Sequence, residues 1–275
     1  MTSSALALVD VLAAEGGGDG GFQAPTIEEF YPEPLASFSL LGIDFEITRI
    51  LVWSLIATAA VAVFFLASVR HPQLVPAKLQ WMGEAAYSFV RDGIAREVIG
   101  REGLRFAPYL AVLFFYILAN NFLGIFPFAQ LAPTAKIALP AFLAAITYIM
   151  FNWVGIRAQG IGPYFKGIAF PPGVPKPMYV LVTPIELAST LIFRPFTLAV
   201  RLFANMFAGH LLLVIFALGT VYLLQVGNFS VIFAPVSFLM AIIMTFFELL
   251  VQVLQAYVFT VLTAAYLAGA LEAEH

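Results

Sequence analysis

The stretch that decides the fold is residues 177–226, PMYVLVTPIELASTLIFRPFTLAVRLFANMFAGHLLLVIFALGTVYLLQV, which is apolar over most of its length. A second long apolar run follows at 231–271, after the turn VGNFS at 226–230. As single helices the two runs would measure about 75 and 60 Å, whereas the hydrocarbon core of a bilayer is about 30 Å thick. We therefore expect two long helices that are steeply tilted, kinked or extended into the interface, folded back on each other as an antiparallel pair.

The rest of the chain has the same apolar character. Of its 275 residues 62% are hydrophobic and only 11% are charged, a composition outside the usual range of soluble domains. Three further runs, at about 47–69, 106–128 and 137–156, are each long enough to cross a membrane as a helix. The sequence thus predicts an all-α integral membrane protein with about five membrane-crossing helices in a single membrane domain, residues 46–275.

The distribution of basic residues predicts the orientation of these helices. Lysine and arginine are concentrated in the segments after the first and third runs, whereas the 129–136 loop holds only Lys136. By the positive-inside rule those two segments are cytoplasmic, so the N-terminus lies outside and the C-terminus in the cytoplasm. Residues 77–100 place apolar and charged side chains on opposite helical faces. They predict an amphipathic helix on the cytoplasmic surface, with a solvated connector as the alternative.

Residues 1–45 differ from the membrane domain in composition. They include the glycine- and proline-rich stretch EGGGDGGFQAPTIEEFYPEP and many of the acidic residues of the chain. This composition predicts a mobile acidic arm outside the membrane. The first residues carry no basic group, and Asp10 interrupts their apolar run, so a cleaved signal peptide is not expected. A bacterial plasma membrane is the expected location.

The composition also excludes several classes of function. Without cysteine the chain has no disulfide, thiolate metal site or cysteine nucleophile. It has no basic run for nucleic acid and no GxxxxGK[ST] loop for nucleotide phosphates. We expect no metal and no cofactor, and any nucleotide chemistry must belong to partner proteins.

Arg201 is the most informative residue of the first long run. An arginine at the middle of a membrane helix costs about 2.5–3.5 kcal/mol on insertion scales, so it marks either a functional site or a side chain that snorkels to the interface. Arg194, Thr197 and Asn205 share its helical face. Because arginine does not deprotonate in a protein, it can attract or separate charges but cannot pass on a proton. Arg201 is our candidate for a gate.

The second long run carries Glu248, Gln252 and Gln255 on one helical face. If the two runs fold back about residue 228, Arg201 lies opposite Gln255, and His210 lies opposite Glu248. Histidine and glutamate both change protonation state, and histidine does so near neutral pH. We predict that His210 and Glu248 relay protons near the outer surface.

Other polar residues predict a second site on the opposite side of Arg201. Glu186 and Ser189 lie toward the cytoplasm, where a helix cap or an interfacial position is the alternative for Glu186. Asn121, at the outer end of the second span, is a candidate to line the outer site, although intramembrane amides often only bond neighbouring helices. The prediction is two polar pockets, one toward each surface, with a fixed positive charge between them.

Two segments resemble the signature segments of one family, subunit a of the F-type ATP synthase. These are RPFTLAVRLFANMFAGH at 194–210 and LQAYVFTVLTAAYLAGALEAEH at 254–275, supported by NNFLGIFP at 120–127. The resemblance covers about residues 45–275. It implies a subunit that conducts protons within the lipid membrane, with its two long helices against a rotating ring of c subunits. The b subunits of the peripheral stalk and the rest of the synthase are the further partners it implies.

The resemblance also implies roles for the polar residues. Arg201 corresponds to the essential arginine that separates two half-channels, with Gln255 and Asn205 as its polar neighbours. The other matches fall into a cytoplasmic half-channel (Glu186, Ser189) and an outer one (His210, Glu248, Gln252, Asn121).

Two features depart from the family pattern. Some members carry glutamate in place of His210 and histidine in place of Glu248, an exchange that supports direct contact between the two positions. Glu186 also precedes Pro195 by nine residues, one more than the family pattern has.

Two other functions fit an intramembrane arginine, histidine and glutamate. A proton-coupled secondary transporter would use them around a substrate site, but the sequence shows no internal repeat of the kind that many transporters have. A membrane scaffold without transport would tolerate the loss of Arg201.

Overall fold

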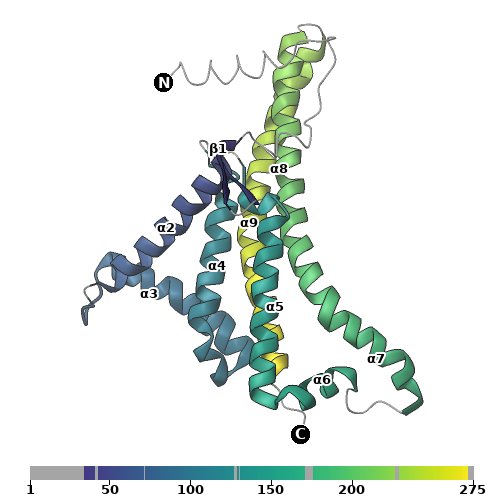
Figure 1. Cartoon of the computed structure of the whole chain (residues 1–275). Helices are drawn as coiled ribbons and strands as arrows, with labels where there is room; N and C mark the ends of the chain where they lie inside the picture. The colour runs from purple at the N-terminus through teal and green to yellow at the C-terminus, as the bar shows by residue number, and fades with distance from the viewer. Residues whose placement is uncertain are drawn as a thin grey trace.

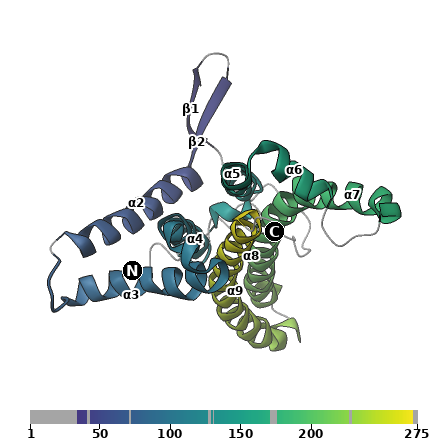
Figure 2. The ribbon, with the colours of Figure 1, turned by 90° about the horizontal axis from the view of Figure 1, so that it is seen from below.

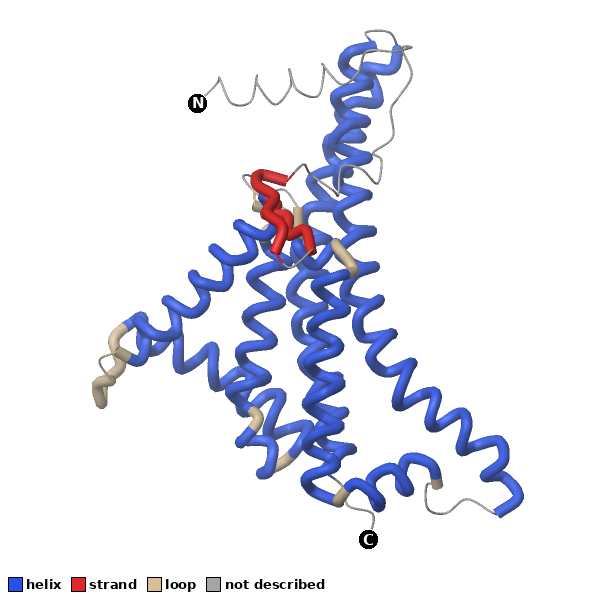
Figure 3. The backbone as a smooth tube through the Cα atoms, viewed as in Figure 1, coloured by secondary structure: helices blue, strands red, loops and turns tan. Residues whose placement is uncertain are grey.

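The computed structural model describes residues 34–40, 43–70, 72–126, 129, 131–170, 176–226 and 229–271. In this part of the chain the protein is helical apart from one β-hairpin, as Figure 3 shows. The α-helices are α2 (Arg49–Val69), α3 (Lys78–Val90), α4 (Ala107–Phe122), α5 (Ala138–Gln159), α6 (Ile161–Ala169), α7 (Tyr179–Ala188), α8 (Arg194–Val226) and α9 (Ala234–Leu271). Shorter helical segments lie between them: π-helical turns at Arg91–Ile99 and Ser189–Phe193, and 3-10 helices at Arg101–Arg105, Pro133–Ala135, Lys176–Met178 and Phe229–Phe233.

The prediction of an all-α membrane protein is confirmed. Within the described residues, four helical stretches are long and apolar enough to cross a membrane: α2, α5, Tyr179–Val226 and Phe229–Leu271. The second predicted span forms the shorter apolar helix α4, which has 16 residues and ends at Phe122 rather than near residue 128. The chain turns there through Gly124, whose N–H donates to the carbonyl of Asn121 at 2.9 Å.

The two long helices form the predicted antiparallel pair. α8 has 33 residues and α9 has 38, so they measure about 50 and 57 Å. They run side by side at the top of Figure 1, and α8 leans away from α9 below, where α5 packs against both. Near the turn the helices keep the predicted register, because a Cβ on Gly219 would lie 3.3 Å from Ser237 Oγ, and these residues are equally far from residue 228. Further along, Gln255 bonds with Asn205, one turn beyond its predicted partner Arg201.

A π-helical turn interrupts the first long run between its two prolines. Pro184 lies inside α7, but the change of helix type comes at Ser189–Phe193, and Pro195 is the second residue of α8. A π-helical turn holds more residues than an α-helical turn, and such turns often mark functional positions. The run is therefore two α-helices, α7 and α8, joined without a loop.

α2 and α3 extend away from the central helices in the same direction, as seen from below in Figure 2. The surface helix predicted at 77–100 is present as α3 continued by the π-helical turn Arg91–Ile99. Gly100 ends it with φ at 87°, a left-handed conformation that glycine adopts without strain. Its position on the cytoplasmic surface stays a prediction.

The β-hairpin of β1 (Pro34–Leu40) and β2 (Ile43–Thr48), which pair antiparallel, was not predicted, and neither was the short helix α6. The strict alternation of polar and apolar residues in SFSL and IDFEI was the signal for strands here. The hairpin leads directly into α2, whose first turn is capped by Thr48 Oγ1 accepting from Leu51 N at 3.4 Å. Most of the predicted arm, residues 1–33, lies outside the described residues.

The core lies where α4, α5, α8 and α9 meet. Its fully buried large side chains include Leu110, Ile117, Leu202 and Phe259. Many other large apolar side chains point outward, for example Phe246, which is 70% exposed. In a soluble protein such a surface would aggregate, whereas a membrane protein presents it to lipid tails or partner helices.

A close approach of α2 and α3 gives a test of this architecture. A methyl group at Gly83 would overlap the side chain of Ser68, which is itself buried and donates to the carbonyl of Phe65 at 2.9 Å. We expect Gly83→Ala to destabilise the packing of the two helices by about 1–3 kcal/mol, the usual cost of overpacking. Thermal unfolding of the detergent-solubilised chain measures this. Gly93→Ala is the control, because nothing lies within 4 Å of a Cβ there; equal melting temperatures of the two variants would contradict the packing.

Candidate functional site

Arg201 lies on the outer face of α8. Its side chain is exposed, and it makes no hydrogen bond or ion pair with any residue that the structure describes. Leu198 and Leu202, next to it on the helix, are buried in the core. Because an arginine facing lipid alone is costly, this position suits a charge that meets a group on another protein.

The side chain of Gln255 on α9 contacts the polar face of α8 on which Arg201 lies. Asn205 Nδ2 donates to Gln255 Oε1 at 2.7 Å, so the hydrogen bond goes to the residue one turn beyond Arg201. Gln255 is 3% exposed, and its Nε2 is buried without a hydrogen-bond partner among the described residues. This amide therefore keeps one buried donor that no described residue satisfies.

A buried polar cluster lies between α4 and α9. We call it the Glu248 cluster: Glu248, Gln252, Asn121 and Thr134, all at most 2% exposed. Gln252 Nε2 donates to Glu248 Oε1 at 3.3 Å, and Asn121 Nδ2 donates to the carbonyl of Gln252 at 3.1 Å. Glu248 Oε2 and Gln252 Oε1 are buried with no partner in the described part of the chain. Buried polar atoms of this kind usually bind water, and a carboxyl group beside water can take up and release a proton.

Two residues of this neighbourhood were missed by the sequence analysis. Thr134 Oγ1 donates to Asn121 Oδ1 at 2.6 Å and fixes the orientation of that amide. Gly124 lies so close to Glu248 that a Cβ there would be 3.2 Å from Oε1. A single threonine between two helices does not stand out in a sequence. Gly124 could have been found, because it lies in the NNFLGIFP segment that supports the family resemblance.

His210 lies on α8 at the level of the Glu248 cluster. Its neighbour Gly209 is the residue of α8 where a Cβ would lie 3.5 Å from Glu248 Cγ. The predicted register thus brings α8 and α9 together at this level. Direct contact of His210 with Glu248 stays a prediction.

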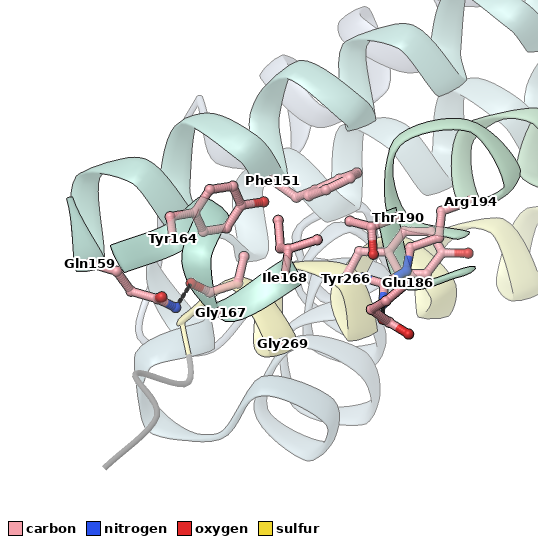
Figure 4. Close-up of a pocket in the computed structure, with 11 residues that line it drawn as sticks. Phe151, Gln159, Tyr164, Gly167, Ile168, Glu186, Thr190, Arg194, Tyr266 and Gly269 are labelled. Atoms are coloured by element: carbon pink, nitrogen blue, oxygen red, sulfur yellow. Dashed lines mark hydrogen bonds and ion pairs between the residues drawn. The ribbon is translucent and has the colours of Figure 1, made fainter. Parts of the chain in front are cut away.

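A cavity of about 210 Å³ lies at the other end of α8, and we call it the Glu186 cavity (Figure 4). Its lining comes from α5, α6, α7, α8, α9 and the π-helical turn: Phe151, Gln159, Tyr164, Gly167, Ile168, Glu186, Thr190, Arg194, Tyr266, Gly269 and Ala270. Of the two residues predicted for this site, Glu186 lines the cavity. Ser189 does not, and its neighbour Thr190 takes that place because the π-helical turn changes the direction of the side chains.

The charged groups of the Glu186 cavity form a pair. Arg194 Nη2 lies 3.5 Å from Glu186 Oε1, and the Arg194 guanidinium lies 5.7 Å from the centroid of the Tyr266 ring. Tyr164 donates through its hydroxyl to Asn152 Oδ1 at 3.0 Å, and burial raises the pKa of this hydroxyl, so it stays neutral. Arg194 was predicted to share the helical face of Arg201, and its ion pair with Glu186 was not predicted.

Arg201 lies between the two polar sites along the helices. On α8 it falls between Arg194, which lines the Glu186 cavity, and Gly209, where an added Cβ would lie 3.5 Å from Glu248 Cγ. On α9 the order is reversed, with Gln255 between Tyr266 and Glu248. The described structure therefore holds two separate polar sites, with an exposed arginine between them.

Comparison with known families identifies the family of the chain. Residues 51–268 match the family described as ATP synthase A chain. The chain belongs to this family. Relatives named ATP synthase subunit a include one from Parafrankia sp. (strain EAN1pec), which is 48% identical over 92% of this chain and 85% of its own length. A second, from Rhodococcus erythropolis, is 46% identical over 92% of both chains, and a third, from Hyphomonas neptunium, is 40% identical over 90% of this chain and 96% of its own length.

Membership of the ATP synthase A chain family confirms the resemblance on which the sequence analysis relied. Together with the membrane-spanning helices, it makes the chain a multi-pass membrane protein that takes part in ATP synthesis and proton transport.

Proposed function

We propose that this chain conducts protons through two half-channels against a rotating ring of c subunits and so couples proton flow to ATP synthesis. The observation that carries the proposal is Arg201, which is exposed and without a partner in the described residues, between a buried carboxyl cluster and an open cavity. A fixed charge in this place is suited to attract a ring carboxylate and to keep protons from passing directly between the two sites.

The two polar sites supply the proton pathways of this mechanism. In the outer half-channel a proton passes His210 and Glu248, with Gln252 and Asn121 along the route, and reaches a carboxylate of the ring. In the inner half-channel a proton released from the ring near Arg201 leaves through the Glu186 cavity, which Thr190, the neighbour of Ser189, lines. Gln255 and Asn205 keep the face of Arg201 polar, so that the ring carboxylate can ionise there.

The proposal includes partners and orientation. The exposed apolar faces of α8 and α9 bind the ring, the b subunits of the peripheral stalk and lipid cover other faces, and the rest of the synthase performs the nucleotide chemistry. The N-terminal arm, residues 1–45, lies outside a bacterial plasma membrane, and the C-terminus lies in the cytoplasm. The basic residues in the segments after the first and third predicted runs support this orientation.

Depletion of the chain tests the function. In inverted vesicles from cells without this chain we expect ATP addition to produce no acidification, because no pathway connects the ring to either surface, and complementation should restore it. A pH-sensitive dye measures the proton gradient. The alternative, a proton-coupled transporter, predicts normal pumping without the chain and proton-driven solute uptake by liposomes that contain the chain alone. That result would overturn the proposal.

A further inference from the structure

We propose that Arg194 is a positioning residue of the Glu186 cavity. Its guanidinium holds the Glu186 carboxylate at the cavity and is itself held by the ring of Tyr266 on α9. The inference rests on the proposed function, because it concerns the proton pathway on this side of Arg201.

The π-helical turn is what brings Glu186 and Arg194 together. They are eight residues apart, which in an uninterrupted α-helix would place them about 80° apart around the axis. The π-helical turn Ser189–Phe193 accommodates about one extra residue. The angle between the two side chains then becomes that of about seven α-helical residues, close to two full turns. Both side chains therefore lie on nearly the same face. Figure 4 shows both side chains beside Tyr266 at one end of the cavity.

Arg194 contacts two separate elements at once. Its ion pair with Glu186 reaches back to α7, and its stacking distance to Tyr266 reaches α9. A guanidinium over an aromatic ring is attracted by the ring face, and its planar shape allows it to bind a carboxylate at the same time. Arg194 therefore fixes where the Glu186 carboxylate lies relative to α9.

The pair does little for stability. The Arg194 and Glu186 side chains are 34% and 38% exposed, and ion pairs in such positions contribute little to the free energy of unfolding. They are the two charged residues of the cavity lining, whose other titratable groups are the hydroxyls of Tyr164 and Tyr266. The net charge of the cavity lining, which acts on a proton inside the cavity, thus depends on whether Arg194 is present. Its role is to place charge and carboxylate at the entrance of the inner pathway.

Thiol labelling tests the charge that Arg194 places beside residue 186. The chain contains no cysteine, so Glu186→Cys gives this chain a single thiol, and labelling is measured on this chain after it is separated from the other subunits. In vesicles that contain the assembled complex, we expect a negatively charged methanethiosulfonate reagent to react faster than a positively charged one. Adding Arg194→Gln should lower that preference by about five- to tenfold, the effect of removing one charge at a solvated distance of a few ångströms.

Arg157→Gln is the matched control for labelling. Arg157 also stacks on an aromatic ring, that of Trp153 at 5.0 Å, but it does not line the cavity. We expect this variant to keep the labelling preference of the parent. An unchanged preference in Arg194→Gln, or an equal fall in both variants, would overturn the assignment.

Proton pumping separates this inference from the proposed function. We expect Arg194→Gln to slow ATP-driven pumping several-fold and Arg194→Lys to restore part of it, because lysine keeps the charge but not the planar fork. Pumping at the parental rate in Glu186→Gln would contradict the inner half-channel itself. Loss of pumping in Glu186→Gln with parental pumping in Arg194→Gln would contradict only the role of Arg194.

Discussion

Replacing Arg201 by alanine is expected to abolish ATP-driven proton pumping while the complex stays assembled. Two opposite charges about 4 Å apart near a protein surface attract each other by about 4 kcal/mol, which corresponds to roughly a thousandfold in an equilibrium. The exposed guanidinium on α8 has no described partner within the chain, so this attraction is available to a ring carboxylate. We expect pumping in inverted vesicles, followed with a pH-sensitive dye, to fall by at least two orders of magnitude.

Because Arg201 lies on the surface of the chain, a loss of pumping in Arg201→Ala can be assigned to the missing charge. Its side chain is exposed, so the substitution leaves no cavity in the core and should not reduce the amount of assembled complex. Arg70→Ala serves as the control, since it removes an exposed arginine at the end of α2, far along the chain from the polar sites. A scaffold without transport predicts parental pumping in Arg201→Ala, and that result would remove the gate from the mechanism.

The second large effect is expected at Glu248. Glu248→Gln keeps the size and the hydrogen bond to Gln252 but removes the only carboxyl group of the Glu248 cluster. Because a glutamine cannot take up and release a proton, we expect pumping and ATP synthesis to fall about a hundredfold, the lower range for the loss of a proton-transfer group. Glu97→Gln, at an exposed carboxylate in the Arg91–Ile99 turn, should behave like the parent.

An exchange of His210 and Glu248 tests whether these two positions act together. The single substitution His210→Glu leaves two carboxyl groups at this level of α8 and α9, and Glu248→His leaves two imidazoles. We expect each single variant to lose most of its proton pumping. The double variant restores one acid and one base and should recover a substantial part of the rate. If the double variant is no more active than the singles, the two positions do not act as a pair.

The sequence was most informative about the helices and their register. Hydropathy over 177–226 and 231–271 predicted two long helices, and their turn at residue 228 predicted the register that Gly219 and Ser237 show. These features depend on the bilayer thickness and on helix geometry, which are the same for every chain. The π-helical turn depends on the local balance of backbone hydrogen bonds, which no periodicity in the sequence reports.

The candidate site was predictable where it depends on ionisable residues in apolar runs. Arg201, Glu248 and Glu186 stand out because charged groups are rare there. Their contacts were less predictable, since the hydrogen bond of Gln255 to Asn205 and that of Thr134 to Asn121 depend on side-chain packing between helices distant in sequence. The ion pair of Arg194 with Glu186 was not predicted, since it depends on the π-helical turn between them, which gives no signal in the sequence.

The wide turn at Ser189–Phe193 has a further consequence for how this family changes over evolution. A turn that accommodates one additional residue lets the chain gain or lose a residue there, while the helix on each side keeps its own orientation. The number of residues between Glu186 and Arg201 can then change by one, and Arg201 still lies on the same face of α8. Length variation among related chains should therefore collect at this turn, and an alignment that places its gap within 189–193 will keep equivalent residues together on both sides.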